Sequence, residues 1–494
     1  MSQTEIINKK SYYIEEWKRG YESQPNEYEY EIDNIEGVIP TELQGTLFRN
    51  GPGLLDIANT PIHHPFDGDG MISAFYFRNG KAYFRNRFVA TVAYLQEKAA
   101  GKILYRGVFG TQKPGGIINN IFDLRLKNIA NTNVIYWGDK LLALWEAAEP
   151  HRLDPQTLET IGIDYLDGVL QPGESWAAHP WVDPDSILDG GQPCLVNFSV
   201  TPGLSSKINI FELAPDGKLL RRHSHVIPGF SFIHDFAITP HYCIFFQNPV
   251  NFNPLPFVFG LKGAGECVEF QPTKPTRVVL IPRDPNNKQV KTFMVDSGFV
   301  FHHANAFETG DNVCIDSIAY ATLPQVEPNS DYKEVNFDNL DPGKLWRFTL
   351  NLKDGTVERQ LLESTCCEFP VVNPDKVGKD YRYLFIGAAH QDTGRNAPLQ
   401  AIMKLDLVTG ERQSHSFAPH GYVSEPIFVP KPNATEEDEG WILTLVYNGK
   451  EHRSSLAILD GQNINGDPVA LLHLKHHIPY GLHGSWTDEV FQDF

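Results

Sequence analysis

Short hairpin signals recur along most of the chain and constrain its fold more than any other feature. FYFRNGKAYF (75–84) alternates apolar and polar residues on both sides of Asn79-Gly80. An Asn-Gly pair tolerates the positive φ angles of a two-residue turn, so this stretch predicts a β-hairpin. Further turns of this kind are expected at Gly138-Asp139, Asp216-Gly217, Asp354-Gly355 and Thr409-Gly410. Many hairpins without alternating helices predict an all-β sandwich, barrel or propeller.

The length of the chain selects among these all-β folds. No Ser/Gly run, long charge block or low-complexity tract divides the 494 residues, so we expect a single domain over 1–494. A sandwich or small barrel would not absorb so many residues, whereas a propeller repeats one four-stranded sheet around an axis. The sequence therefore favours a β-propeller, with a degenerate repeat because no WD or kelch signature is present.

Helical patterns are rare, and one apolar segment has no clear period. TVAYLQEKAAGK (91–102) predicts a helix. The segment that follows, ILYRGVFGTQKPGGIINNIFDL (103–124), is apolar without periodicity. It is either a buried loop or an exposed apolar patch, and the pattern leaves both open.

Charge and cysteine content exclude several functions and locations. The net charge of 42 − 61 = −19 argues against nucleic acid and against electrostatic attachment to anionic lipid, so any membrane contact would be apolar. The six cysteines form no CxxC pair and are expected to be reduced core thiols. MSQTEIINKK (1–10) has no apolar core of a secretory signal, and no run approaches the roughly 18 apolar residues of a spanning helix. We therefore expect a cytoplasmic protein.

Histidines in short apolar stretches suggest a metal site. They are His179 in SWAAHPW, His234 in FSFIHDF, His302 and His303 in FVFHHANAFE, and His483 in YGLHGSW. The successive spacings are 55, 68 and 181 residues, the last about three times 60. One inward histidine per blade of this length would bring four imidazoles to a propeller axis, where they could hold a transition metal. The alternative, core histidines on separate strands, remains open on spacing alone.

His302 and His303 cannot easily serve one centre together. Successive side chains on a strand point to opposite faces, so at most one of the two is a ligand. A metal-bound imidazole also needs its second nitrogen held, usually by a carboxylate. Glu146, Glu368 and Glu425 stand in apolar strands and are candidates for this role. They could equally be bonded to backbone amides or to an arginine.

Longer stretches resemble the carotenoid cleavage oxygenases, and within that family the branch that cleaves apocarotenoids. The matching stretches run nearly from end to end: GTLFRNGPG (45–53), HPFDGDGM (64–71), FDLRLKNIANTNVIYWGDKLLALWE (122–146), FIHDFAITPHY (232–242), FHHANAFE (301–308), NFDNLDPGKLWRF (336–348), CCEFP (366–370) and HHIPYGLHGSW (476–486). The resemblance implies a seven-bladed β-propeller with a helical and loop cap over the tunnel entrance. It also implies a non-haem Fe(II) on the axis.

The resemblance assigns roles to particular residues. It implies His179, His234, His302 and His483 as iron ligands, with Glu146, Glu368 and Glu425 orienting His234, His302 and His483 in that order. His303 is then expected to pack on the other face of its strand. Thr132 matches a threonine that crowds an open position at the metal. Phe66, Trp145 and Phe369 match positions near the substrate tunnel, although each could simply pack in the core.

The activity implied by the resemblance is oxidative cleavage of a C=C bond in an apocarotenoid. The 15,15′ bond is expected to be cut, both atoms of O₂ entering two carbonyl products of the retinal type. Segment 103–124 matches a membrane-dipping patch, so peripheral membrane association of a monomer is expected. The alternatives are a cut at another bond, such as 9,10, and a non-catalytic apocarotenoid-binding propeller. A calcium-dependent propeller hydrolase is a further one, suggested by DGDG (67–70).

Overall fold

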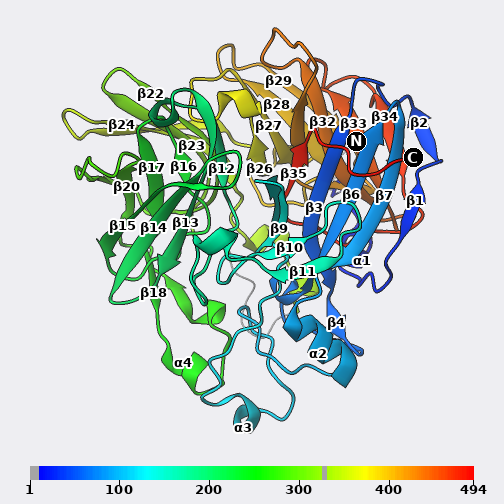
Figure 1. Ribbon diagram of the computed structural model, residues 1–494, viewed down its shortest axis with the longest axis horizontal. Coiled ribbons are helices and arrows are strands. Elements are labelled where there is room, and N and C mark those ends of the chain that lie inside the picture. Colours follow the sequence, from blue (N-terminus) through cyan, green and yellow to red (C-terminus); the bar gives the residue numbers. More distant parts are fainter. Residues whose placement is uncertain (1–9, 325–330) are drawn as a thin grey trace, which may run out of the picture.

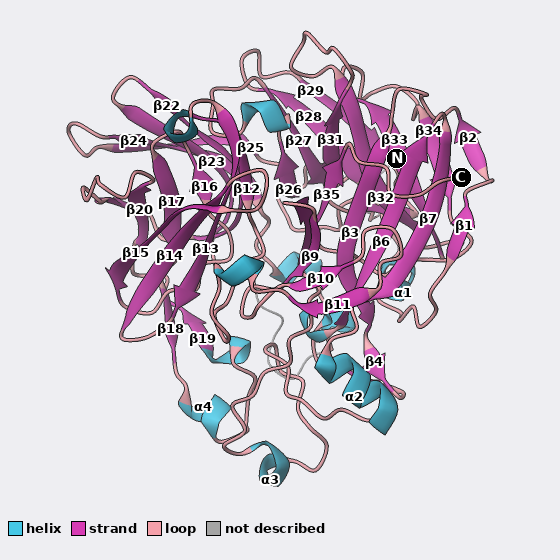
Figure 2. Cartoon of the chain, in the orientation of Figure 1, coloured by secondary structure: helices cyan, strands magenta, loops and turns pink. Residues whose placement is uncertain are grey.

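Seven β-sheets, set around a common axis, form the body of the computed structural model, which describes residues 10–324 and 331–494 (Figure 1). Strands dominate these residues, and the few helices are short (Figure 2). The predicted seven-bladed β-propeller is therefore confirmed.

The first three blades hold the N-terminal part of the chain and its last strand. Blade 1 has the order β1 (Glu29–Glu31), β7 (Lys81–Phe88), β6 (Asp69–Arg78), β3 (Gly45–Leu54) and β35 (Gly484–Thr487). Blade 2 consists of β8 (Asn133–Trp137), β9 (Lys140–Leu144), β10 (His151–Leu153) and β11 (Thr160–Ile163). Blade 3 consists of β12 (Trp181–Ser186), β13 (Gln192–Thr201), β14 (Ser205–Leu213) and β15 (Leu219–Pro228).

The remaining blades follow in chain order. Blade 4 consists of β16 (Ala237–Ile238), β17 (Tyr242–Gln247), β20 (Thr276–Pro282) and β21 (Lys291–Val295). Blade 5 consists of β22 (Phe299–Thr309), β23 (Asn312–Tyr320), β24 (Lys344–Asn351) and β25 (Val357–Glu363). Blade 6 consists of β26 (Cys367–Val371), β27 (Tyr383–Ala388), β28 (Ala401–Asp406) and β29 (Arg412–Ser416). Blade 7 consists of β30 (Gly421–Val423), β31 (Ile427–Pro430), β32 (Gly440–Asn448), β33 (Arg453–Asp460), β34 (Ala470–His473) and β2 (Ile35–Gly37).

Both ends of the described chain close the ring. The late strand β35 pairs with β3 in blade 1, and the early strand β2 pairs with β34 in blade 7. Two short pairs lie outside the blades: β4 (Asp56–Ile57) with β5 (Thr60–Pro61), and β18 (Val250–Phe252) with β19 (Val268–Phe270). Because blade 1 contains strands from both ends of the sequence, the ring is complete only when residues 484–487 are in place.

The predicted hairpin turns join adjacent strands of one blade. Asn79 and Gly80 have φ angles of 52° and 75° and connect β6 to β7, with Arg78 paired to Lys81. Both central residues of a tight hairpin turn must take positive φ, which asparagine and glycine tolerate best. The turns at 138–139, 216–217, 354–355 and 409–410 likewise link paired strands. The hairpin predictions are therefore confirmed.

The helices α2 (Val92–Ala100), α3 (Ile117–Asn120) and α4 (Leu255–Val258) lie with long loops on one side of the propeller (Figure 1). Together with α1 (Ile14–Arg19), they are the four α-helices of the described residues. The helix predicted over 91–102 is α2. The Thr91 hydroxyl accepts the N–H of Tyr94 at its start, and Gly101 ends it with a φ of 61°.

Apolar side chains between neighbouring blades form the core. Phe198 of blade 3 packs edge-on against Phe245 of blade 4 at 5.2 Å between ring centroids, and both belong to one large buried cluster. All six cysteines are buried and free. The expectation of unpaired core cysteines is therefore confirmed.

Candidate metal centre

Four histidine side chains from four blades meet on the propeller axis. His179 precedes β12, His234 precedes β16, His302 lies within β22 and His483 precedes β35. These strands form one edge of their sheets, and neighbouring edges contact one another around the ring. One ring nitrogen of each histidine lies within 4.8 Å of those of the other three. The structure thus brings together side chains separated by up to 304 residues, from 179 to 483.

Three glutamates hold the outer nitrogens of these rings. Each contact joins an imidazole Nδ1 to a carboxylate oxygen: His234 to Glu146 at 2.5 Å, His302 to Glu368 at 2.6 Å and His483 to Glu425 at 2.7 Å. An Nδ1–H that donates to a carboxylate leaves the Nε2 lone pair of the ring free. For His179, the described residues offer no such carboxylate partner.

The inner nitrogens are spaced as ligands of one metal ion would be. The Nε2 atoms of His179 and His234 are 2.9 Å apart, and those of His234 and His302 are 3.2 Å apart. Two imidazole nitrogens bound at right angles, each roughly 2.1 Å from a metal, would be about 3.0 Å apart. Lone pairs that face one another this closely repel unless a proton or a metal cation lies between them. The residues therefore fit a transition metal, which imidazole ligands favour.

Burial keeps two of the rings neutral. It lowers the pKa of His179 well below its usual value, and the neighbouring imidazoles lower that pKa further. Burial also lowers the pKa of His483, to about 4. At His302 burial lowers the pKa, but the Glu368 carboxylate outweighs it and raises the pKa to about 9. Because metal binding at Nε2 needs a neutral ring, a bound ion would displace that proton.

His303 points away from the axis. Its Nδ1 is 2.8 Å from the Ser317 hydroxyl oxygen on β23, and its ring centroid is 5.0 Å from that of Phe246 on β17. The backbone N–H of His303 donates to Asp235 at 2.8 Å. Of the histidine pair, only His302 joins the group of four on the axis.

Thr132 lies directly before β8, beside the segment that carries the fourth histidine. Its carbonyl oxygen accepts the N–H of His483 at 3.1 Å, and its own N–H donates to Leu144 at 3.1 Å. Its hydroxyl donates to the Asn131 side chain at 3.2 Å. Thr132 is buried and fixed at the axial end of blade 2.

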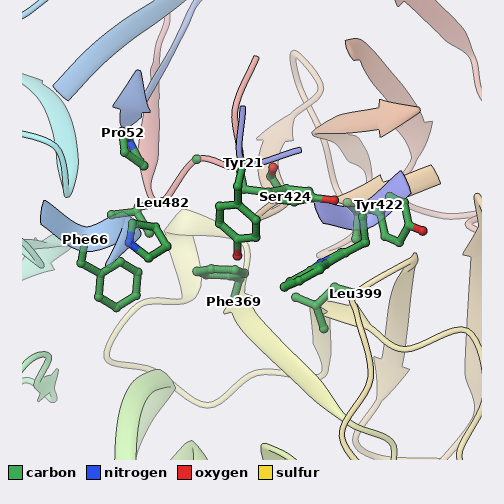
Figure 3. A pocket seen from close by; sticks show the side chains of 13 residues that line it. Tyr21, Pro52, Phe66, Phe369, Leu399, Tyr422, Ser424 and Leu482 are labelled. Atoms are coloured by element: carbon green, nitrogen blue, oxygen red, sulfur yellow. The ribbon is translucent and has the colours of Figure 1, made fainter. Parts of the chain in front are cut away.

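A cavity of about 230 Å³ has aromatic walls (Figure 3) and is lined by Phe369 and by Leu482, the chain neighbour of His483. Phe66 and Phe369 line it, and Figure 3 shows both rings facing the same space. The Phe369 ring lies 5.5 Å from that of His302 and 5.4 Å from that of His483, between ring centroids. Trp145 is buried and does not line this cavity.

Other walls of the cavity come from segments that sequence reasoning missed. Trp17 of α1 and the nearby Tyr21 line it together with Tyr422 and Tyr480. The density of aromatic residues in SYYIEEWKRGY (11–21) is the one signal that could have pointed to this segment. Its packing against blade 7 could not be predicted, because some 400 residues separate the partners.

The aspartates of DGDG (67–70) are occupied by protein partners. The Asp67 carboxylate accepts the N–H groups of Phe109 at 2.9 Å and Thr111 at 3.1 Å. Asp69 forms an ion pair with Lys127 at 2.7 Å. Calcium needs several oxygen ligands directed at one point, so this arrangement does not support the calcium-dependent alternative.

Segment 103–124 is partly buried and partly exposed. Arg106 is fully buried, whereas Ile117, Ile118 and Phe122 are 52%, 86% and 68% exposed. The N–H of Phe122 donates to the Val258 carbonyl at 2.8 Å, which joins this segment to α4. We call the resulting surface the apolar tip; it consists of Ile117, Ile118, Phe122, Leu124, Leu255, Phe259 and Leu261. The interpretation as a buried loop is therefore right for the part around Arg106, and the interpretation as an exposed apolar patch is right for the part from Ile117 onward. None of the described helices is long and apolar enough to span a membrane.

Comparison with known proteins finds relatives over nearly the whole chain. The family model of the retinal pigment epithelial membrane protein matches residues 21–488. The apocarotenoid-15,15′-oxygenase of Synechocystis sp. is 57% identical over 98% of this chain and 98% of its own. The lignostilbene-α,β-dioxygenase isozyme III of Sphingomonas paucimobilis is 30% identical over 92% and 93% of the two chains. The crystal structure of the cobalt-substituted Synechocystis oxygenase superposes with a TM-score of 0.95 at 57% identity, covering 97% of this chain and 100% of that one.

Proposed function

Because the chain belongs to the retinal pigment epithelial membrane protein family, which includes the carotenoid oxygenases, we propose that it is a dioxygenase that cleaves apocarotenoids. One observation carries the proposal: four imidazoles with inward lone pairs meet beside a cavity with aromatic walls. A polyene-cleaving oxygenase needs both features, a metal that can meet O₂ and an apolar site for a long hydrocarbon.

His179, His234, His302 and His483 are the proposed ligands of an Fe(II) cofactor. Bound iron would supply the activation of dioxygen, which amino-acid side chains cannot perform. The cobalt-substituted relative supports a metal at this site. Glu146, Glu368 and Glu425 would fix the orientation of three rings and keep a proton on each Nδ1.

The remaining site residues act by position. We assign Thr132 a place beside the metal, where it restricts the space next to His483. Phe369 and Phe66 would hold the polyene against the histidines and exclude water, because their rings line the adjoining cavity. Trp145 is buried outside the cavity lining, and its proposed part in substrate binding would be indirect, through its chain neighbour Glu146. No acid or base is needed, because the products are two carbonyl compounds that together take up both atoms of O₂.

The 15,15′ double bond is the proposed point of cleavage, with retinal-type aldehydes as products. The name of the relative that is 57% identical supports this position. The alternatives are a cut at another double bond, such as 9,10, and a propeller that binds an apocarotenoid without turnover. Iron content and oxygen uptake distinguish the enzyme from the binder.

The substrate would be taken from a membrane surface. The apolar tip exposes seven large hydrophobic side chains among the described residues, although the chain carries a net charge of −19. Contact through apolar side chains is therefore favoured over contact with anionic headgroups. We propose a cytoplasmic monomer, a single domain over 1–494, that associates peripherally with membranes through this tip.

Product chromatography tests the proposed reaction. The Fe(II)-loaded protein is incubated with an apocarotenal under air and under argon, with the His302→Ala variant as the matched control. We expect retinal under air alone, and none from the variant. Intact substrate in both gases, with one iron per chain, would reject the 15,15′ cut; oxygen uptake with other carotenoids would then separate a different cut from a non-catalytic binder.

A further inference from the structure

Arg49 is, within the described parts of the chain, the one lysine or arginine whose side chain is hydrogen-bonded to a glutamate of the metal centre. It lies on β3 and is 3% exposed. Its Nη1 donates to Glu425 Oε2 at 2.5 Å, and its Nη2 donates to the Leu482 carbonyl at 2.8 Å. The other oxygen of Glu425 accepts from His483. A guanidinium, a carboxylate and an imidazole thus form a chain that ends on the axis.

Among the residues that the structure describes, the other two glutamates have no such cation. Glu368 Oε1 accepts from the neutral hydroxyl of Tyr320 at 2.8 Å. Glu146 has His234 as its side-chain partner in the described structure. The three histidine–glutamate pairs therefore differ in what contacts the outer side of the carboxylate. Within 10–324 and 331–494, only the glutamate that holds His483 is hydrogen-bonded to a positively charged side chain.

Negative charge otherwise dominates the surroundings of the centre. Besides the three glutamates, Asp235 is buried next to His234, where it accepts the N–H groups of His303 and Phe236. Arg49 is the positively charged side chain that is hydrogen-bonded to one of these carboxylates. In a buried site a fixed positive charge opposes each further positive charge on a nearby metal, so it disfavours a trivalent ion relative to a divalent one.

Closure of the ring places Arg49 in this position. Arg49 on β3 is paired with Gly484 on β35, and the N–H of Gly484 also donates to Glu425 Oε2, at 3.1 Å. Arg49 therefore contacts three parts of the site: strand β35, the Glu425 carboxylate and Leu482, which directly precedes His483. The geometry couples closure of the propeller to completion of the metal centre.

We propose that Arg49 positions Glu425 and His483 and that its charge favours the divalent state of the bound metal. This inference rests on the proposed iron centre and adds a residue outside the ligands and their glutamate partners. The Arg49 guanidinium donates to Glu425 and to the Leu482 carbonyl, and not to any of the four proposed ligands, so it is a positioning residue. Its charge and its geometric role can be separated experimentally.

The test measures the Fe(III)/Fe(II) midpoint potential of four proteins, and Zn²⁺ affinity as a readout that does not depend on redox state. They are the wild type, Arg49→Met, Glu425→Gln and the double variant Arg49→Met/Glu425→Gln. We expect Arg49→Met to stabilise Fe(III) over Fe(II) by about tenfold, a fall of about 59 mV for one electron. Glu425→Gln removes a negative charge and should raise the potential. The double variant should return towards the wild-type value.

The double variant keeps the test decisive if Arg49→Met fails to fold. It leaves no unpaired buried charge and is therefore expected to fold better than either single variant. The comparison of Glu425→Gln with the double variant then isolates the charge of Arg49. Potentials that are equal in that comparison, with iron bound, would overturn the proposal. Arg49→Lys, which keeps the charge, should stay near the wild-type potential. A wild type that binds no iron would instead reject the proposed function, and this inference with it.

Discussion

The imidazoles of His302 and His303, neighbours in the sequence, lie on opposite sides of β22. His302 Nε2 lies 3.2 Å from that of His234 on the axis, and His303 Nδ1 lies 2.8 Å from the Ser317 hydroxyl between two blades. Strand geometry therefore separates a candidate ligand from a packing residue within one dipeptide.

The two histidines are expected to respond differently to substitution. His302→Ala should abolish metal binding and activity, because it removes one of four ligands. His303→Ala should keep one metal per chain and lose about 1–3 kcal/mol of unfolding free energy through the lost hydrogen bond and packing. Metal analysis and denaturation of both purified variants check this. Equal metal loss in the two variants would undo the assignment.

Glu146 is expected to affect metal binding through the imidazole of His234, which it holds. Glu146→Gln weakens the contact with His234 Nδ1, and the loss of such a carboxylate typically lowers metal affinity about 10–100-fold. Glu308→Gln is a matched control, because Glu308 holds His241 Nδ1 at 2.9 Å on the surface. Competition with a chelator measures the affinity. An unchanged affinity in Glu146→Gln would remove Glu146 from the metal centre.

Removal of residues 483–494 should affect both metal binding and stability. The truncation deletes His483 and β35, which pairs with β3 and closes the ring. His483→Ala should lose the metal alone, since β35 stays in place. Metal content and the midpoint of urea unfolding distinguish the two variants. A fully active truncated protein would require a different fourth ligand and an open ring.

The apolar tip should govern binding to lipid vesicles. Replacing Ile118 and Phe122 by serine should lower the floated fraction of protein by tenfold or more, because burial of each side chain contributes about 1.5–3 kcal/mol. Val408→Ser is the control, since Val408 is 75% exposed on the β28–β29 turn of blade 6. Flotation with neutral liposomes measures the effect. A wild type that stays wholly in the soluble fraction would reject membrane association.

Lys127 should stabilise the side of the molecule that carries the helices. Its ammonium group lies 2.7 Å from Asp69 and 2.6 Å from Glu97 of α2, and all three side chains are buried. Lys127→Met leaves two buried carboxylates without a cation and should cost about 3–5 kcal/mol of unfolding free energy. Lys218→Met breaks an exposed pair with Asp216 and should change little. Denaturation of both variants compares them; equal midpoints would contradict the role of Lys127.

Local features of the fold were predictable from the sequence. The turn at Asn79-Gly80 and the helix between Thr91 and Gly101 depend on residues within a few positions of one another. Their backbone preferences act locally, whatever the rest of the chain does. The number of blades came from the resemblance to a family, because no repeat motif in the chain marks them.

The exposure of segment 103–124 could not be decided from its own residues. Arg106 is buried because its guanidinium donates to carbonyl groups that include those of Phe257 and Lys262, more than 150 residues away. Ile118 stays exposed because no described segment covers it. The sequence pattern is apolar in both halves, so burial is a property of the packing.

The sequence by itself determined the strands, their turns and the set of histidines from which a metal centre could be drawn. The residues alone left His302 and His303 open, and the family resemblance selected His302. Only the tertiary structure decided that Arg49 stands behind Glu425. The physical reason is the range of the interactions. Hairpins and caps form between residues close in the chain, whereas the axial contacts join β3, β22 and β35 only after all seven blades close the ring.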